Sequence, residues 1–126
     1  MTRFQHHYTV DEARALLPRI RTWLARLDLL HAQLQSADRS IDSILASGAD
    51  AGGTTVNERV RLELERSQVL EEFSHRDLVL RGHELGQVDF PSIREGREVF
   101  LCWERSDTSV EYWRELEEAG EDRFGL

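Results

Sequence analysis

The chain has 126 residues, of which 40% are hydrophobic and 32% charged, and its formal net charge at pH 7 is −8. This size and composition are typical of one globular or helix-rich domain, so we expect a single domain over residues 1–126. The negative charge argues against nucleic-acid binding, and the single cysteine excludes an internal disulfide. No stretch reaches the roughly 18 consecutive apolar residues of a membrane-spanning helix, so we expect a cytoplasmic protein that binds neither membrane nor nucleic acid.

A long amphipathic helix is predicted from about residue 10 to residue 44. Thr9 and Glu12 have the spacing of a capping box, which fixes the start of this helix. Apolar residues then recur at alternating intervals of three and four, the pattern of a coiled coil. They are Ala13, Leu16, Ile20, Trp23, Leu27, Leu30, Leu34, Ala37, Ile41 and Ile44.

A second, shorter helix is predicted to return antiparallel to the first. Residues 46–55 contain three glycines and small polar residues, so we expect a flexible connector there. Thr55 and Glu58 repeat the capping pattern and predict a helix through about Arg76, which completes a helical hairpin over 9–76. Because the second helix is shorter, it leaves the first half of the long helix uncovered, and residues 77–126 have to supply that cover.

The remainder is predicted to form a small antiparallel sheet. Short strands are expected at 78–81 and 87–90, with Pro91 ending the second of them. Residues 97–103 are apolar on both faces, as expected for a central strand covered on both sides. Residues 110–116 fit a short helix or a further strand, and the sequence does not decide between them. The expected fold class is α+β, a long antiparallel helical hairpin packed on a small antiparallel β-sheet.

Three segments resemble a bacterial protein family known as domain of unknown function 2203. They are "YTVDEARALLPRI", "VDFPSIREGREVFLCWE" and "EYW", and with them the resemblance extends over nearly the whole chain. It implies no activity, because no activity is established for that family. Members tend to carry a histidine directly after the last tryptophan, whereas Trp113 is followed by Arg114, so a function that needs this histidine is not implied here.

The aromatic segment offers a possible ligand or partner surface. The residues concerned are Asp89, Phe90, Arg97, Trp103, Tyr112 and Trp113. Aromatic side chains contribute much area to cores, so we expect most of them to cover the long helix. The alternative is a mostly apolar pocket with Asp89 and Arg97 at its rim. Cys102 lies within a hydrophobic strand, so we expect a buried thiol and no catalytic residue.

Two motifs match part of a helical-bundle metal site. Asp28 precedes His31 and Glu72 precedes His75 with the carboxylate-x-x-histidine spacing of di-metal bundles. A bundle site needs more inward carboxylates than this chain provides, so no metal and no cofactor are expected.

We expect a non-catalytic interaction or assembly module that forms homo-oligomers through its helices, with an unidentified protein partner as a further possibility. Apolar residues beside the main stripe, such as Leu17, Leu24 and Leu29, exceed what the shorter helix can cover, and such patches usually mark association. One alternative is a metal- or small-molecule-binding protein that uses His31, Glu72 and His75 or the aromatic pocket. Another is a small enzyme of unknown reaction.

Overall fold

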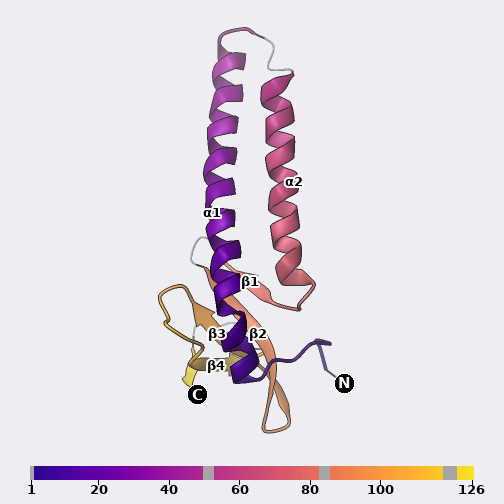
Figure 1. Cartoon of the computed structure of the whole chain (residues 1–126), viewed down its shortest axis with the longest axis vertical. Coiled ribbons are helices and arrows are strands. Elements are labelled where there is room, and N and C mark those ends of the chain that lie inside the picture. The colour runs from indigo at the N-terminus through magenta and orange to yellow at the C-terminus, as the bar shows by residue number, and fades with distance from the viewer. Residues whose placement is uncertain (1, 50–52, 83–85, 118–121) are drawn as a thin grey trace. The chain divides into compact units, whose positions relative to one another are not determined.

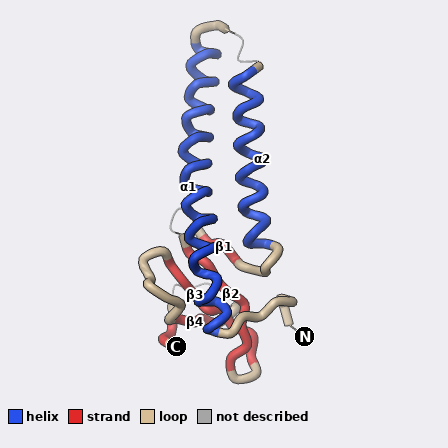
Figure 2. Tube along the Cα trace, viewed as in Figure 1, coloured by secondary structure: helices blue, strands red, loops and turns tan. Residues whose placement is uncertain are grey.

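The computed structural model describes residues 2–49, 53–82, 86–117 and 122–126. It contains two helices, α1 (Val10–Ala46) and α2 (Thr54–Ser74), followed by five strands (Figure 1). The strands are β1 (Val79–Arg81), β2 (Gln87–Arg94), β3 (Arg97–Glu104), β4 (Tyr112–Glu115) and β5 (Phe124–Gly125). They form one antiparallel sheet in chain order, which confirms the α+β class (Figure 2).

The chain divides into two compact units. The sheet unit comprises Met1–Leu24 and Glu72–Leu126, and the hairpin unit comprises Ala25–Glu71. Each helix contributes to both units, and each unit is described separately below. That the whole chain acts as one domain stays a prediction. No helix in the described ranges combines the length and apolar character needed to span a bilayer.

The predicted start of α1 is confirmed, whereas that of α2 is wrong. The N–H of Thr9 donates to Glu12 Oε1 at 3.0 Å, and the N–H of Glu12 donates to Thr9 Oγ1 at 3.1 Å. This is the reciprocal bonding of a capping box. In α2 the backbone carbonyl of Gly53 accepts the N–H of Asn57 at 3.0 Å, so Thr55 already lies inside the helix. Glycine is tolerated as a cap, which permits the earlier start.

The hairpin unit is held together by a small apolar cluster with ion pairs beside it. Leu30 and Leu34 of α1 pack with Leu62 of α2, and the partly buried Val69 packs against them. Arg59 Nε lies 2.5 Å from Asp38 Oδ1, and Arg26 pairs with Glu65. These contacts confirm that the two helices pack on each other in this unit as an antiparallel hairpin (Figure 1).

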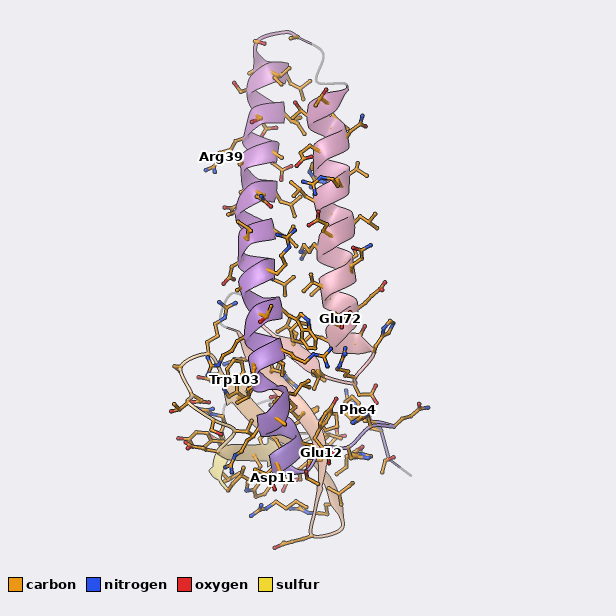
Figure 3. The ribbon with its side chains drawn as sticks, in the orientation of Figure 1. Phe4, Asp11, Glu12, Arg39, Glu72 and Trp103 are labelled. Carbon is orange, nitrogen blue, oxygen red and sulfur yellow. The ribbon has the colours of Figure 1, made fainter. Side chains whose placement is uncertain are left out.

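In the sheet unit the first part of α1 lies against one face of the sheet. Arg14 donates to the carbonyl of Val110 through Nε and Nη2 at 3.1 and 2.9 Å. The Arg21 guanidinium lies 4.9 Å from the ring of Trp103, the residue labelled in Figure 3. By the strand register and the alternation of side chains, the helix-side face carries Val88, Phe90, Val99, Leu101, Trp103 and Trp113. The opposite, far face carries Asp89, Pro91, Phe100, Cys102, Tyr112 and Arg114.

The strand β2 continues past Pro91, which corrects the prediction that proline would end it. β1 pairs with β2 only as far as Asp89, so beyond that residue β2 has an edge to which none of the described strands is paired. There the carbonyl of Pro91 points away from β3 and accepts the N–H of Tyr8 at 2.7 Å. A proline at such an edge removes no ladder hydrogen bond, which is why it is tolerated. The open choice for residues 110–116 is resolved as a strand, β4.

Candidate functional site

The predicted ligand surface is divided between the two faces of the sheet. Phe90 and Trp103 are almost completely buried on the helix-side face, where the Trp103 Nε1–H donates to the carbonyl of Asp107 at 3.1 Å. Trp113 lies on the same face, partly exposed and in contact with the Phe124 ring at 5.1 Å. Phe90 and Trp103 therefore belong mainly to the packing between the sheet and its cover, whereas Trp113 packs within the sheet on its neighbouring strand.

Arg97 lies at the opposite end of β3 from Trp103. Its side chain is exposed, and its Nη2 atom lies 2.8 Å from Glu115 Oε1 on β4. Asp89 and Tyr112 lie on the far face, each opposite Cys102 on a neighbouring strand. The structure therefore places Asp89 and Tyr112 on one face with Cys102 between them, and it separates both from the three aromatic residues on the helix-side face.

Asp89 is held by two arginines. Only 3% of its surface is exposed, and its Oδ2 atom accepts hydrogen bonds from Arg81 Nε at 2.5 Å and Arg114 Nη2 at 2.6 Å. Arg114 is also buried, and both guanidiniums lie over the Phe100 ring, at 5.6 and 5.3 Å from its centroid. Charged groups at this depth have to be paired, so this arrangement serves the fold of the far face.

Cys102 lies beside this group, and its burial confirms the expectation from its sequence neighbours. Burial, together with the negative charge of Asp89, raises the pKa of the Cys102 thiol to about 12, against the opposing effect of Arg114. The thiolate is the nucleophilic form of cysteine, and its fraction near neutral pH is very small at such a pKa. The environment of Cys102 therefore gives no support to thiol chemistry.

The four weak candidates for metal ligands are divided between the two units, two in each. Asp28 and His31 are exposed on the part of α1 in the hairpin unit, whereas Glu72 and His75 lie at the end of α2 in the sheet unit. Glu72 is labelled in Figure 3. Glu72 Oε2 accepts a hydrogen bond from Arg76 Nη1 at 2.9 Å. Over the described ranges, no group of three or more histidine, cysteine, aspartate or glutamate side chains could hold a metal ion.

A second apolar face on α2 is the feature that sequence reasoning did not single out. Val56, Val60 and Leu64 are exposed, with 61% of Val60 and 59% of Leu64 accessible. Residues four apart share one face of a helix, whereas residues two apart point about 200° away from each other. This outer stripe (Val56, Val60 and Leu64) therefore faces away from the buried Leu62, the residue that packs on α1.

Charged side chains flank the outer stripe on both sides. One flank carries Arg59 and Glu63, whose Nη2 and Oε1 atoms lie 3.4 Å apart. On the other side Arg61 follows Val60 directly, and its Nε donates to Glu58 Oε2 at 3.0 Å. Glu58 lies four residues before Leu62, so it is on the side of α2 that faces α1 and not beside the outer stripe. One flank thus combines a positive and a negative side chain, and the other presents Arg61, beside an exposed apolar row. An apolar centre with a polar rim is the usual layout of an association surface.

The signal for the outer stripe was present in the sequence. The apolar residues of α2 are spread over a wide arc, and the arc consists of two rows. The buried row contains Leu62, Val69 and Phe73, and the spacing of four in Val56, Val60 and Leu64 marks the other.

Comparison with known proteins identifies the family alone. A family model described as "Uncharacterized conserved protein (DUF2203)" matches residues 6–126. No curated protein and no solved structure matches the chain. The match extends over nearly the full length, and it includes both helices and all five strands. The chain therefore belongs to the DUF2203 family of uncharacterized conserved proteins.

Proposed function

We propose that this protein is a non-catalytic assembly module that self-associates through the outer stripe of α2. The observation that carries the proposal is the second apolar face of α2, which lies opposite the face packed on α1. Exposed valine and leucine side chains in a row lose contact with water only when a partner covers them. Such a stripe on a helix is the usual element of helix-to-helix association.

The charges beside the stripe favour a second copy of the same chain as the partner. In an antiparallel pair of α2 helices related by a two-fold axis at Val60, each flank faces the same flank of the other copy. On one flank Arg59 then lies near Glu63 of the second copy. The flank with Arg59 and Glu63 is therefore complementary to itself, as a two-fold interface requires.

Val60→Glu tests the apolar part of this surface. In the proposed dimer, the substitution brings two carboxylates together at the two-fold axis, so it should abolish the dimer without unfolding the chain. Sedimentation equilibrium measures the mass, and circular dichroism checks the helix content. The matched control is Gln35→Glu, the same added charge at an exposed position of α1. Self-association that survives Val60→Glu but fails with Gln35→Glu would assign the interface to another surface.

A pair of complementary variants tests the partner and its orientation. Arg59→Glu and Glu63→Arg each place like charges across the proposed interface, so each variant alone should associate several-fold more weakly than the wild type. Arg59 also pairs with Asp38 of its own chain, so circular dichroism checks the helix content of both variants. An equal mixture restores opposite charges at both contacts, so it should form a mixed dimer. Exposed ion pairs contribute about 0–1 kcal/mol each, which sets the size of the effect. Failure of the mixture to associate better than either variant would contradict the antiparallel arrangement.

A further inference from the structure

A cavity of 340 Å³ lies in the sheet unit at the start of α1. Its apolar lining comes from three places: Tyr8 and Val10 at the start of the helix, Ile93 and Leu101 on the sheet, and Leu126. Ligand pockets occupy about 300–1,000 Å³ and are mostly apolar, with a few polar groups that orient the ligand. The size fits a molecule of about one aromatic ring with a short side chain.

The Tyr8 hydroxyl donates to the carbonyl of Arg76 at 2.8 Å. Apart from Tyr8, four polar side chains line the cavity, and three of them are already bound to the protein. Ser92 Oγ donates to the carbonyl of Tyr8 at 2.6 Å, and Thr9 Oγ1 caps α1. His7 Nε2 lies 2.7 Å from Glu98 Oε2. These groups shape the cavity, and the fourth, Arg94, is left for recognition.

Arg94 differs from the other polar lining residues in having no acidic partner among the described residues. Its guanidinium lies over the Trp113 ring, 5.0 Å from the centroid, and the ring fixes its position without neutralising its charge. An arginine held in this way at the wall of an apolar cavity is suited to a carboxylate, which it can bind through two parallel hydrogen bonds.

The start of α1 adds hydrogen-bond donors on the same side. The N–H of Glu12 is capped by Thr9, but within the part of the chain that the structure describes no acceptor is found for the N–H groups of Val10 and Asp11. Val10 itself lines the cavity. The carboxylate of Glu12 is engaged by the N–H of Thr9. The free N–H groups and the positive end of a helix dipole both favour an anion here.

We propose that this cavity binds a small organic acid, with its apolar body against Tyr8, Leu101 and Leu126 and its carboxylate at Arg94 and the first turn of α1. Every residue of the cavity lies in the sheet unit, so the site is independent of the outer stripe of α2. The ligand class follows from the cavity, which has an apolar wall and one charged group of positive sign.

Two matched probes test the ligand class. 3-Phenylpropionate and its neutral amide, 3-phenylpropionamide, have the same body and differ in charge. We expect 3-phenylpropionate to give saturable shifts of the Val10 and Arg94 amide signals in ¹⁵N–¹H spectra of the full chain. The amide probe should bind about tenfold more weakly, a difference of about 1.4 kcal/mol. Equal affinity for the two probes, or no saturable shift with the acid, would overturn the proposal.

Arg94→Gln tests the assigned residue. It should weaken binding of 3-phenylpropionate about tenfold and leave binding of the amide nearly unchanged, because only the charged contact is lost. The control is Arg97→Gln on the neighbouring strand, whose guanidinium binds Glu115 and lies outside the cavity lining. Unchanged affinity of the Arg94→Gln protein for the acid would remove Arg94 from the site. If that variant does not fold, the comparison of the two probes on the wild type decides.

Discussion

The carboxylate of Asp89 shows how much the sheet unit depends on a single charged residue. It is buried on the far face, and two arginines donate to the same oxygen atom. Burying a charge costs several kcal/mol, and that cost is met only while the partners are in place. If one member of such a group is removed, the remaining charges stay buried with fewer opposite charges to offset the cost of burial.

We therefore expect Asp89→Asn to lower the free energy of unfolding by about 3 kcal/mol. Chemical denaturation of the purified variant measures this change. Asp42→Asn is the matched control, since Asp42 is exposed on α1 and its change should stay within about 0.5 kcal/mol. A loss at Asp89 no larger than the loss at Asp42 would show that the ion pairs contribute little.

The position of Asp89 also explains why the sequence predicted some buried residues correctly but not which side chains meet. Its neighbour Phe90 was among the aromatic residues expected mostly in the core, and it is fully buried. Asp89 itself points to the opposite face, and its partners Arg81 and Arg114 come from other strands. Which residues meet across a sheet depends on register, and one sequence does not specify register between distant strands.

At the scale of elements, Glu98 anchors the segment before α1. Its carboxylate oxygens accept the N–H of Arg3 at 2.7 Å and the N–H of Phe4 at 3.0 Å, and His7 Nε2 lies 2.7 Å away. The Phe4 ring packs on the Phe100 ring at 5.5 Å (Figure 3). Burial alone would raise the pKa of the Glu98 carboxyl, but the hydrogen bonds from His7, Arg3 and Phe4 outweigh it and lower that pKa below 4.5.

This lowered pKa gives a pH dependence with a definite sign. The contribution of Glu98 to stability is present above pH 4.5, the ordinary value, and is lost as the pH falls through the lower pKa of the folded state. Glu98→Gln should cost about 1–2 kcal/mol at pH 7, since hydrogen bonds to a charged group are strong. Unfolding measured from pH 7 down to pH 3 should show the difference from the wild type shrinking. Glu111→Gln, at an exposed position, should show no such trend, and a constant difference for Glu98→Gln would contradict this assignment.

Helices and strands could be predicted where the sequence signal came from residues close together in the chain. The start of α1 follows from Thr9 and Glu12, which bond to each other within one turn. The predicted end of β2 was wrong because Pro91 is tolerated at an edge of the sheet. Tyr8 occupies that edge, and this contact joins residues far apart in the sequence. The choice between helix and strand for residues 110–116 was also decided by distant pairing, since β4 lies between β3 and β5.

At the scale of the whole molecule, the long helix is shared between two units. Residues up to Leu24 belong with the sheet, and Ala25–Glu71 form the hairpin unit. From the uneven helix lengths we predicted that α2 covers one part of α1 and that the rest of the chain covers the other part. The helix lengths did not predict the outer stripe of α2, because a short helix with two apolar rows gives no clear single period.

The central claim is that the outer stripe of α2 joins two copies of the chain. The most direct measurement is the mass of the untagged wild-type protein by sedimentation equilibrium over a dilution series. We predict a mass that rises with concentration from 14.6 kDa, the mass of one chain, toward twice that value, and a variant Val60→Glu that stays at 14.6 kDa throughout. A wild-type mass that remains at 14.6 kDa up to about 1 mM, where an association of only about −4 kcal/mol would be visible, would contradict the claim.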